Sequence, residues 1–345
     1  MEFGIGCWNC DQLPDDNRPH SELYQEMLEE VQVAEQNNFD CAWLTEHHFT
    51  PGGYMPSVTS SLAAMAAVTD EIDLGTNIAL GPQYKQPVRL AEDLAVIDNI
   101  SDGRVRFGVG NGYRVEEFEH FDVPLDQRAV RLENLIQILR KSWADEPLTH
   151  EPNDILKGEY SSWEFDGANV TPKPKQDGGP PVIIGGFAPP AIERAGRMGD
   201  GFTIGSLVGM DEAKDAVDLY WQSVEDAGKD PDEQELVIWN FAFLTDGGDA
   251  EGIVEDGWEH TLDQYGRWYH NAGMIEGPDQ LHAGFNEVAM YYDDPDRMIE
   301  EIEKYQDIFG DDFHFVYQAA QPCTDSEELK RSIELFGQEV IPHFD

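Results

Sequence analysis

The chain of 345 residues is 40% hydrophobic and 11% aromatic, enough apolar material for a large core, which excludes disorder as its main state. It carries 69 acidic against 22 basic residues, a formal net charge of −47, so its surface repels phosphate backbones and anionic lipids and disfavours nucleic-acid and membrane partners. The acidic residues are spread along the whole chain, which suits a cytoplasm with molar salt. We therefore expect a halophilic, archaeal source in preference to an acidic mesophilic one.

Neither targeting nor membrane insertion is indicated. The first twelve residues lack the basic start and apolar stretch of a signal peptide, and no run reaches the roughly 18 apolar residues of a membrane span. Four cysteines are too few for a disulfide scaffold in a chain of this length. We expect a soluble, cytoplasmic protein.

Short β-branched or aromatic runs alternate with amphipathic runs from the first strand onwards. In the first helix Ser21 is the expected N-cap, and one face carries the apolar stripe Leu23, Met27, Leu28, Val31 and Ala34. In chain order the pattern predicts strand 3–7, helix 21–37, strand 41–45, helix 58–68, strand 73–80, helix 88–99, strand 105–109, helix 128–143, strand 181–185, helix 189–198, strand 201–204, helix 211–227, strand 235–243, helices 250–265 and 296–309, strand 313–318 and helix 326–341.

Eight strands, each followed by a helix, predict parallel strands joined by right-handed crossovers. Eight such units most simply close into a (β/α)₈ TIM barrel, with residues 1–345 as a single domain and irregular insertions at 145–180 and 270–293. The alternative is an open doubly wound sheet, but its phosphate-cradling first turn is missing.

Active sites of such barrels lie where the strands end, and two histidines follow the second strand. His47 and His48 cannot both face a pocket from an extended segment, and no third ligand stands at metal spacing. A general acid or base is the functional interpretation; a pair of hydrogen-bonded wall residues is the structural one. The aromatic residues Trp8, Phe49, Tyr113 and Trp239 predict an apolar substrate pocket beside them.

Glycines end the fourth strand. The run 108–112 fails the dinucleotide fingerprint because Tyr113 breaks its spacing and because it lies in the fourth unit. Gly110, Asn111 and Gly112 are therefore expected to let a flat ring or a phosphate approach the backbone, the alternative being a tight loop without a ligand.

A phosphate site is predicted after the fifth strand. The residues that lead into the next helix are Gly185, Gly186, Phe187 and Ala188, and a helix N-terminus attracts anions. Arg128 is the expected cationic partner; the alternative for this residue is a surface salt bridge with Asp126 or Glu133.

The string Glu46-His47-His48-Phe49, the segment 87–93 and the run 101–110 together resemble the luciferase-like flavin monooxygenases along the whole chain. The resemblance implies a barrel that binds reduced flavin mononucleotide (FMN) non-covalently and uses dioxygen to oxygenate a small organic substrate. By position His47 matches the catalytic histidine of the family and Arg128 a phosphate-binding arginine. It also implies a non-prolyl cis peptide at Asn77-Ile78 beneath the flavin ring.

Some positions depart from luciferase: Asn111 replaces an arginine, Gly110 a cysteine, and Phe187 and Pro190 hydroxyl residues. One alternative is therefore hydride transfer with a deazaflavin coenzyme, and another is a barrel that binds flavin without catalysis. Because no NAD fingerprint is present, reduced flavin is expected from a separate NAD(P)H-dependent flavin reductase. By analogy with luciferase we also expect a homodimer built through helices 58–68 and 88–99.

Overall fold

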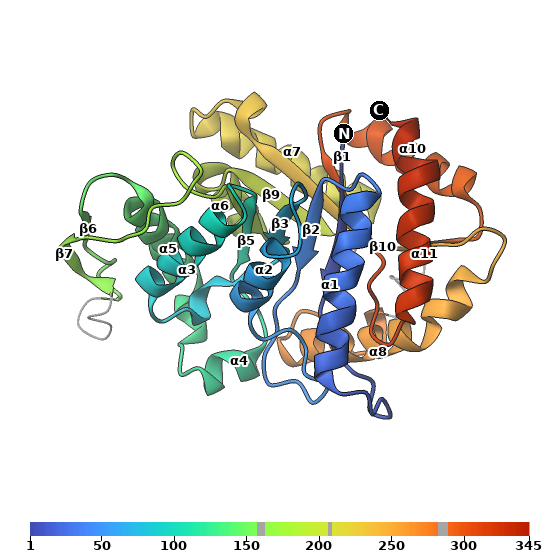
Figure 1. Ribbon diagram of the computed structural model, residues 1–345. Coiled ribbons are helices and arrows are strands. Elements are labelled where there is room, and N and C mark those ends of the chain that lie inside the picture. The colour runs from blue at the N-terminus through green and yellow to red at the C-terminus, as the bar shows by residue number, and fades with distance from the viewer. Residues whose placement is uncertain (157–162, 206–208, 282–288, 345) are drawn as a thin grey trace.

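The computed structural model describes the chain except residues 157–162, 206–208, 282–288 and 345. Its centre is a closed barrel of eight parallel strands (Figure 1). In barrel order these are β1 (Glu2–Trp8), β2 (Cys41–Leu44), β3 (Asp73–Thr76), β5 (Val105–Gly110), β8 (Val182–Gly185), β9 (Gly201–Gly205), β10 (Glu235–Leu244) and β12 (His314–Gln318). The barrel closes because β10 pairs with both β9 and β12, and β12 with β1. The predicted (β/α)₈ architecture is confirmed.

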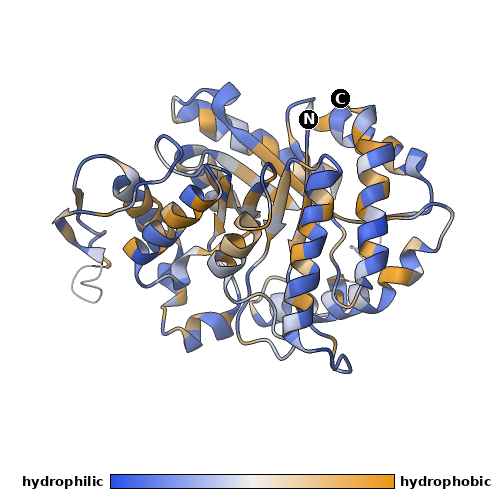
Figure 2. Ribbon diagram, viewed as in Figure 1, coloured by the Kyte–Doolittle hydropathy of each residue, from blue (hydrophilic) through white to orange (hydrophobic). Residues whose placement is uncertain are grey.

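Helices surround the barrel, with apolar faces toward the strands and hydrophilic faces outward (Figure 2). On α1 (His20–Gln36) the predicted stripe is buried at Leu23, Met27, Val31 and Ala34, and Leu28 is half-buried. The other long helices are α2 (Val58–Ala66), α3 (Pro87–Ile100), α5 (Arg128–Trp143), α6 (Pro189–Met198), α7 (Met210–Asp226), α8 (Ala250–Asn271), α10 (Pro295–Phe309) and α11 (Ser326–Leu335).

Side chains fill the barrel at the amino ends of the strands. Arg106 of β5 forms ion pairs with Glu2, Asp73 and Glu235, one from each of three other strands. Above this layer the buried cluster Cys7, Cys41, Trp43, Ile183, Val237 and Val316 fills the interior. Since side chains fill this end, the open end of the described barrel is the one at the carboxyl ends of the strands.

Several predicted boundaries were wrong. Pro19, not Ser21, occupies the N-cap of α1, and no side chain caps that helix. The strand predicted over 73–80 is interrupted by the cis peptide Asn77-Ile78, which separates β3 from β4 (Ala79–Leu80). The cis bond expected from the resemblance is thus present.

Three further differences concern the connections. The excursion 145–180 contains an antiparallel pair, β6 (Leu148–His150) and β7 (Phe165–Ala168). A short helix, α4 (Val115–His120), follows β5 and was not predicted. The helix predicted to end at residue 265 continues to Asn271 as α8, which leaves a shorter second excursion that contains β11 (Met290–Tyr292). Its residues 282–288 lie outside the described part.

Among the described residues, no helix combines the length and the apolar character needed to cross a bilayer.

Candidate functional site

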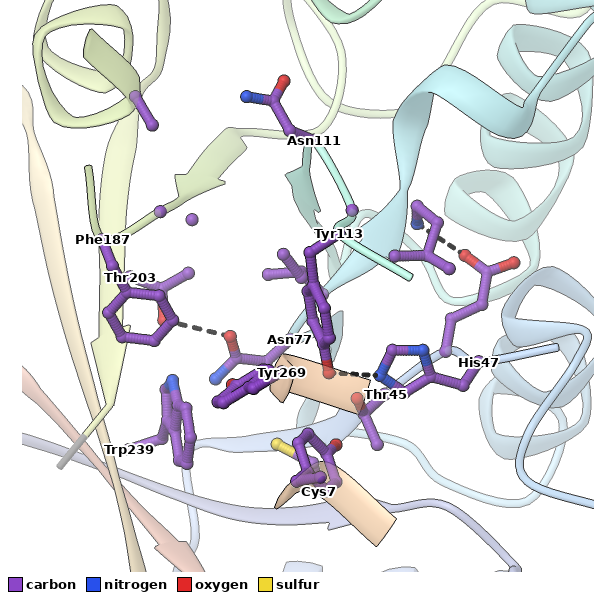
Figure 3. Close-up of a pocket in the computed structure, with 18 of the residues that line it drawn as sticks. Cys7, Thr45, His47, Asn77, Asn111, Tyr113, Phe187, Thr203, Trp239 and Tyr269 are labelled. Carbon is purple, nitrogen blue, oxygen red and sulfur yellow. Dashed lines mark hydrogen bonds between the residues drawn. The ribbon is translucent and has the colours of Figure 1, made fainter. Parts of the chain in front are cut away.

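A cavity of about 540 Å³ opens at the carboxyl ends of the barrel strands (Figure 3). Its size is typical of small-ligand pockets. Most of the residues singled out from the sequence line it. They are His47, Asn77, Ile78, Asn111, Gly112, Tyr113, Arg128, Gly185, Gly186, Phe187, Ala188 and Trp239.

Two predicted substrate residues, Trp8 and Phe49, lie elsewhere. The pairing of β1 with β2 shifts register between Ile5 and Trp8, so Cys7 faces the cavity while the Trp8 indole donates to Glu30 at 2.7 Å. Phe49 is 45% exposed and packs on the rings of His120 and Phe121, outside the cavity. The prediction that these two residues line the substrate pocket was wrong.

His48 and Gly110 also lie outside the cavity lining. The His48 ring lies 3.0 Å from Glu46 and packs edge-on against Phe121, so His47 is the histidine that faces the cavity. A Cβ at Gly110 would lie 2.1 Å from Cδ1 of Ile78. Gly110 therefore makes room for the side chain of Ile78. It is Ile78, and not Gly110, that lines the cavity.

His47 is held by a buried carboxylate. Its Nδ1 lies 2.9 Å from Oε1 of Glu117, which also accepts from the backbone N–H of His48 and from Arg114. Burial alone would raise the pKa of Glu117, but His47, this N–H group and Arg114 together lower it below its ordinary value. An ionised carboxylate only accepts hydrogen bonds, so Nδ1 of His47 carries a proton.

Aromatic rings enclose His47 on the remaining sides. Tyr54, Tyr265 and Trp268 have their ring centroids 5.0, 5.8 and 4.6 Å from that of the imidazole. The hydroxyls of Tyr54 and Tyr265 are 2.7 Å apart. Burial raises the pKa of both phenols, so they remain neutral.

Sequence reasoning missed Glu117 and the aromatic residues of α8, and it placed Arg114 at the barrel mouth without its contact to Glu117. Helix α4, which carries Glu117, has six residues, too few for an apolar period to show. The one feature of the sequence that could have indicated Glu117 is its position, seven residues after the end of β5 and so near the mouth of the barrel. Tyr265 and Trp268 fell outside or at the edge of the predicted helix because its end was placed too early.

A second buried carboxylate supports the cavity floor. Glu46 accepts from the backbone N–H of Leu80 at 2.7 Å and from the hydroxyl of Tyr84 at 3.1 Å, and it lies beside His48. With these partners both carboxyl oxygens have hydrogen bonds within the protein.

Arg128 provides positive charge at the cavity wall. Its guanidinium donates to the carbonyl of Leu125 at 3.1 Å, and it forms no ion pair within the described residues. Glu133, offered above as an alternative partner, is paired with Arg194 and Arg197. In a chain with a net charge of −47, an arginine on a cavity wall without a carboxylate partner marks a place for an anion.

The start of α6 faces the same cavity. Its first two residues, Pro189 and Pro190, have no N–H group, and the N–H of Ala191 bonds to the carbonyl of Ala188. An anion at this end of α6 would therefore be attracted by the helix dipole and by the backbone N–H groups of residues 186–188. An ordinary helix N-terminus presents more free N–H groups than this one.

Two buried amide atoms on the cavity wall have no nitrogen or oxygen partner among the described residues. They are Nδ2 of Asn77, a donor that faces the weakly accepting sulfur of Cys7, and Oδ1 of Asn111, an acceptor. The Oδ1 of Asn77 is fixed by the hydroxyl of Thr203 at 3.0 Å. Buried polar atoms are normally hydrogen-bonded, so these two point to a polar ligand.

Comparison with known proteins shows the family and agrees with the fold. A family model described as luciferase-like monooxygenase matches residues 1–312. The oxygenase component of a flavin-dependent trigonelline monooxygenase from Acinetobacter baylyi is 23% identical, over 95% of this chain and 92% of its own length. An F420-dependent glucose-6-phosphate dehydrogenase from Nakamurella multipartita is 26% identical, over 92% of this chain and 91% of its own. The crystal structure of a monooxygenase from Streptomyces bottropensis covers 100% of both chains with a TM-score of 0.82 at 25% identity.

Proposed function

Because the chain belongs to the luciferase-like monooxygenase family and is an oxidoreductase, we propose that it uses reduced FMN and dioxygen to oxygenate a small organic substrate. The observation that carries the proposal is the make-up of one cavity. It joins a histidine paired with a buried carboxylate, His47 with Glu117, to an arginine without an ion-pair partner among the described residues, Arg128.

The lining residues fit a flavin nucleotide. Asn77 offers a donor and Asn111 an acceptor for the polar edge of a ring system, and neither atom has a nitrogen or oxygen partner in the described part of the chain. Arg128 and the backbone of 186–188 would hold the phosphate. When bound, the reduced flavin would supply the electrons that activate dioxygen.

The chain's own contribution would be proton management and exclusion of water. Glu117 fixes the ring of His47 and keeps a proton on Nδ1, so Nε2 is the nitrogen that can gain or lose a proton. The rings of Tyr54, Tyr265 and Trp268 shield this pair from solvent. A dry setting strengthens each electrostatic interaction in the site.

The substrate would be largely apolar and uncharged. The cavity wall away from Arg128 includes Trp239, Phe241, Tyr269 and Met274, and Glu46 is already satisfied by protein partners. A charged group placed among these rings would lose its hydration without gaining a counter-charge. Trigonelline and glucose 6-phosphate, the charged compounds in the relatives' names, would be poor ligands on this ground.

Reduced flavin would come from a separate flavin reductase. The A. baylyi relative is by name the oxygenase component of its system, and this chain carries no dinucleotide fingerprint. The homodimer expected from the luciferase analogy remains a prediction.

Deazaflavin-dependent hydride transfer is the second candidate. The N. multipartita relative is named as dependent on F420, which is the deazaflavin coenzyme, and it matches 92% of this chain. The two prolines that open α6 also leave few donors for a terminal phosphate. Such an enzyme would work without oxygen, so the two candidates differ in a measurable way.

Oxygen uptake with reduced FMN tests the proposal, with a panel of neutral ring ketones and aldehydes as substrates. Wild type should form oxygenated product, and His47→Ala should lower turnover by about 10²-fold while FMN affinity holds. His343→Ala, which removes an exposed histidine paired with Glu303, is the control. Product formed without oxygen on the deazaflavin coenzyme would favour the second candidate, and equal turnover in His47→Ala would support a barrel that binds flavin without using this histidine.

A further inference from the structure

Both ring nitrogens of His47 have protein partners. Nδ1 faces Glu117 at 2.9 Å, and Nε2 lies 3.4 Å from the hydroxyl of Tyr113 (Figure 3). A ring nitrogen forms its hydrogen bond in the plane of the ring, in a single direction. In this arrangement the hydroxyl of Tyr113 occupies the direction through which Nε2 would reach a ligand.

The surroundings of His47 leave little other access. The side chain is 5% exposed, and Tyr54, Tyr265 and Trp268 pack against the ring. A substrate large enough to need this cavity cannot reach Nε2 without displacing Tyr113.

Tyr113 itself lies at the cavity surface. It comes from the connection between β5 and α4, lines the cavity and packs edge-on against Tyr269 with centroids 4.8 Å apart. Figure 3 shows its ring crossing the middle of the pocket, with the hydroxyl directed at His47. One side of this hydroxyl therefore meets the histidine, while the ring borders the space a ligand would fill.

We infer that Tyr113 is a catalytic residue that passes a proton between His47 and the substrate. In the acid direction the O–H bond of Tyr113 breaks as a new bond forms from that proton to an oxygen of the ligand. At the same time the Nε2–H bond of protonated His47 breaks and its proton goes to Tyr113. Tyr113 ends unchanged, His47 ends neutral, and the base direction is the reverse. The inference rests on the proposed function and adds a residue to it.

Two features suit Tyr113 to this part. Burial raises the pKa of its hydroxyl, so it keeps its proton at rest and acts as a neutral carrier. The charged groups facing the pair, Glu117 of α4 and Arg114 at the N-cap of this helix, lie on the far side of the imidazole and bond to each other at 3.1 Å. The other facing groups are the phenols of Tyr54, Tyr265 and Tyr269, and burial raises the pKa of all three, so they are neutral.

Nitrogen NMR of the flavin-free protein tests the contact without any turnover. Tyr113→Phe should shift the ¹⁵N resonance of His47 Nε2, because that nitrogen loses its hydrogen bond, and should leave Nδ1 nearly unmoved. Tyr220→Phe is the matched control, since it removes another 3.4 Å hydroxyl contact of a buried tyrosine, to the carbonyl of Glu235. An unmoved Nε2 resonance in Tyr113→Phe would overturn the inference.

Reoxidation of bound reduced FMN by dioxygen tests the role. Tyr113→Phe should slow this reaction at least about 10-fold and reduce its solvent deuterium isotope effect. The double variant with His47→Ala should be no slower than His47→Ala alone, because two residues on one proton path are not additive. Slowing that multiplies in the double variant, or none in Tyr113→Phe, would show that Tyr113 is not on the path. If wild type fails to bind reduced FMN, the proposed cofactor is wrong, whereas the NMR result still decides the contact.

Discussion

Glu30 places a carboxyl group on the otherwise apolar inner face of α1, among Met27, Val31 and Ala34. It accepts from the indole of Trp8 and from the hydroxyl of Ser326, both at 2.7 Å. Burial outweighs these two hydrogen bonds and raises its pKa from 4.5 to about 7. The side chain thus links β1, α1 and the start of α11 through a group that titrates near neutral pH.

This shift predicts how Glu30 affects stability. Between pH 4.5 and about 7 the folded chain holds a proton that the unfolded chain has lost, so the free energy of unfolding falls as pH rises and levels off above 7. Glu30→Gln keeps one acceptor and one donor for the same partners and cannot titrate. From pH 4.5 to 8 the variant should gain about 3 kcal/mol relative to wild type.

Urea unfolding at fixed high salt, repeated across this pH range, measures the difference. Taking the variant minus wild type cancels the titration of the many other carboxylates. Parallel stability curves for the two proteins would contradict the raised pKa.

How far the sequence predicts individual residues depends on their distance from a strand end. His47, Asn77 and Gly185 line the cavity, as predicted from their positions, because each follows or ends a strand whose apolar run is unambiguous. Trp8 was misplaced because a register shift inside β1 exchanges the two faces, and alternation alone does not predict such a shift. Glu117 was missed because its contact with His47 spans 70 positions in the chain.

At the scale of elements, α8 covers one side of the cavity and is held from outside it. Asp11, in the connection after β1, accepts from His260 and Gln264 of this helix, both at 3.0 Å. These two residues are four apart and therefore share one helix face. The next turn of α8 carries Tyr265 and Tyr269, which line the cavity.

Asp11→Ala should therefore weaken the attachment of α8, which forms the roof of the site with Tyr265 and Tyr269. It removes the acceptor of the buried Gln264 and of the half-buried His260, which costs about 1–3 kcal/mol, and should speed hydrogen exchange in residues 260–270 more than elsewhere. The control is Asp249→Ala, which removes the N-cap contact to Gly252 and costs the same helix about 1 kcal/mol at its far end. If both variants speed exchange over 260–270 equally, Asp11 does not hold the roof.

The elements themselves were largely predictable. Short apolar runs located all eight barrel strands, which are buried on both faces, and amphipathic runs located every long helix of the described residues. The end of α8 and the short helix α4 were not predictable from the sequence. Their packing partners are side chains of the site that lie far away in the sequence. The break between β3 and β4 was expected only through the family resemblance.

For the whole molecule, the barrel explains how a chain with 69 acidic residues keeps one cationic wall inside its site. Hydrophilic residues lie on the outward faces of the helices (Figure 2). Three carboxylates share Arg106 at the amino end of the barrel, and Arg128 lines the cavity. The halophilic source inferred from this charge remains a prediction.

The binding of reduced FMN under anaerobic conditions tests the central claim most directly. We expect wild type to bind reduced FMN at least about 10-fold more tightly than the deazaflavin coenzyme. Arg128→Ala should lose about 10-fold or more in affinity for reduced FMN. Reduced riboflavin, which has no phosphate, should bind equally to wild type and to Arg128→Ala. Preference for the deazaflavin coenzyme, or an equal affinity for FMN in Arg128→Ala and wild type, would contradict the account.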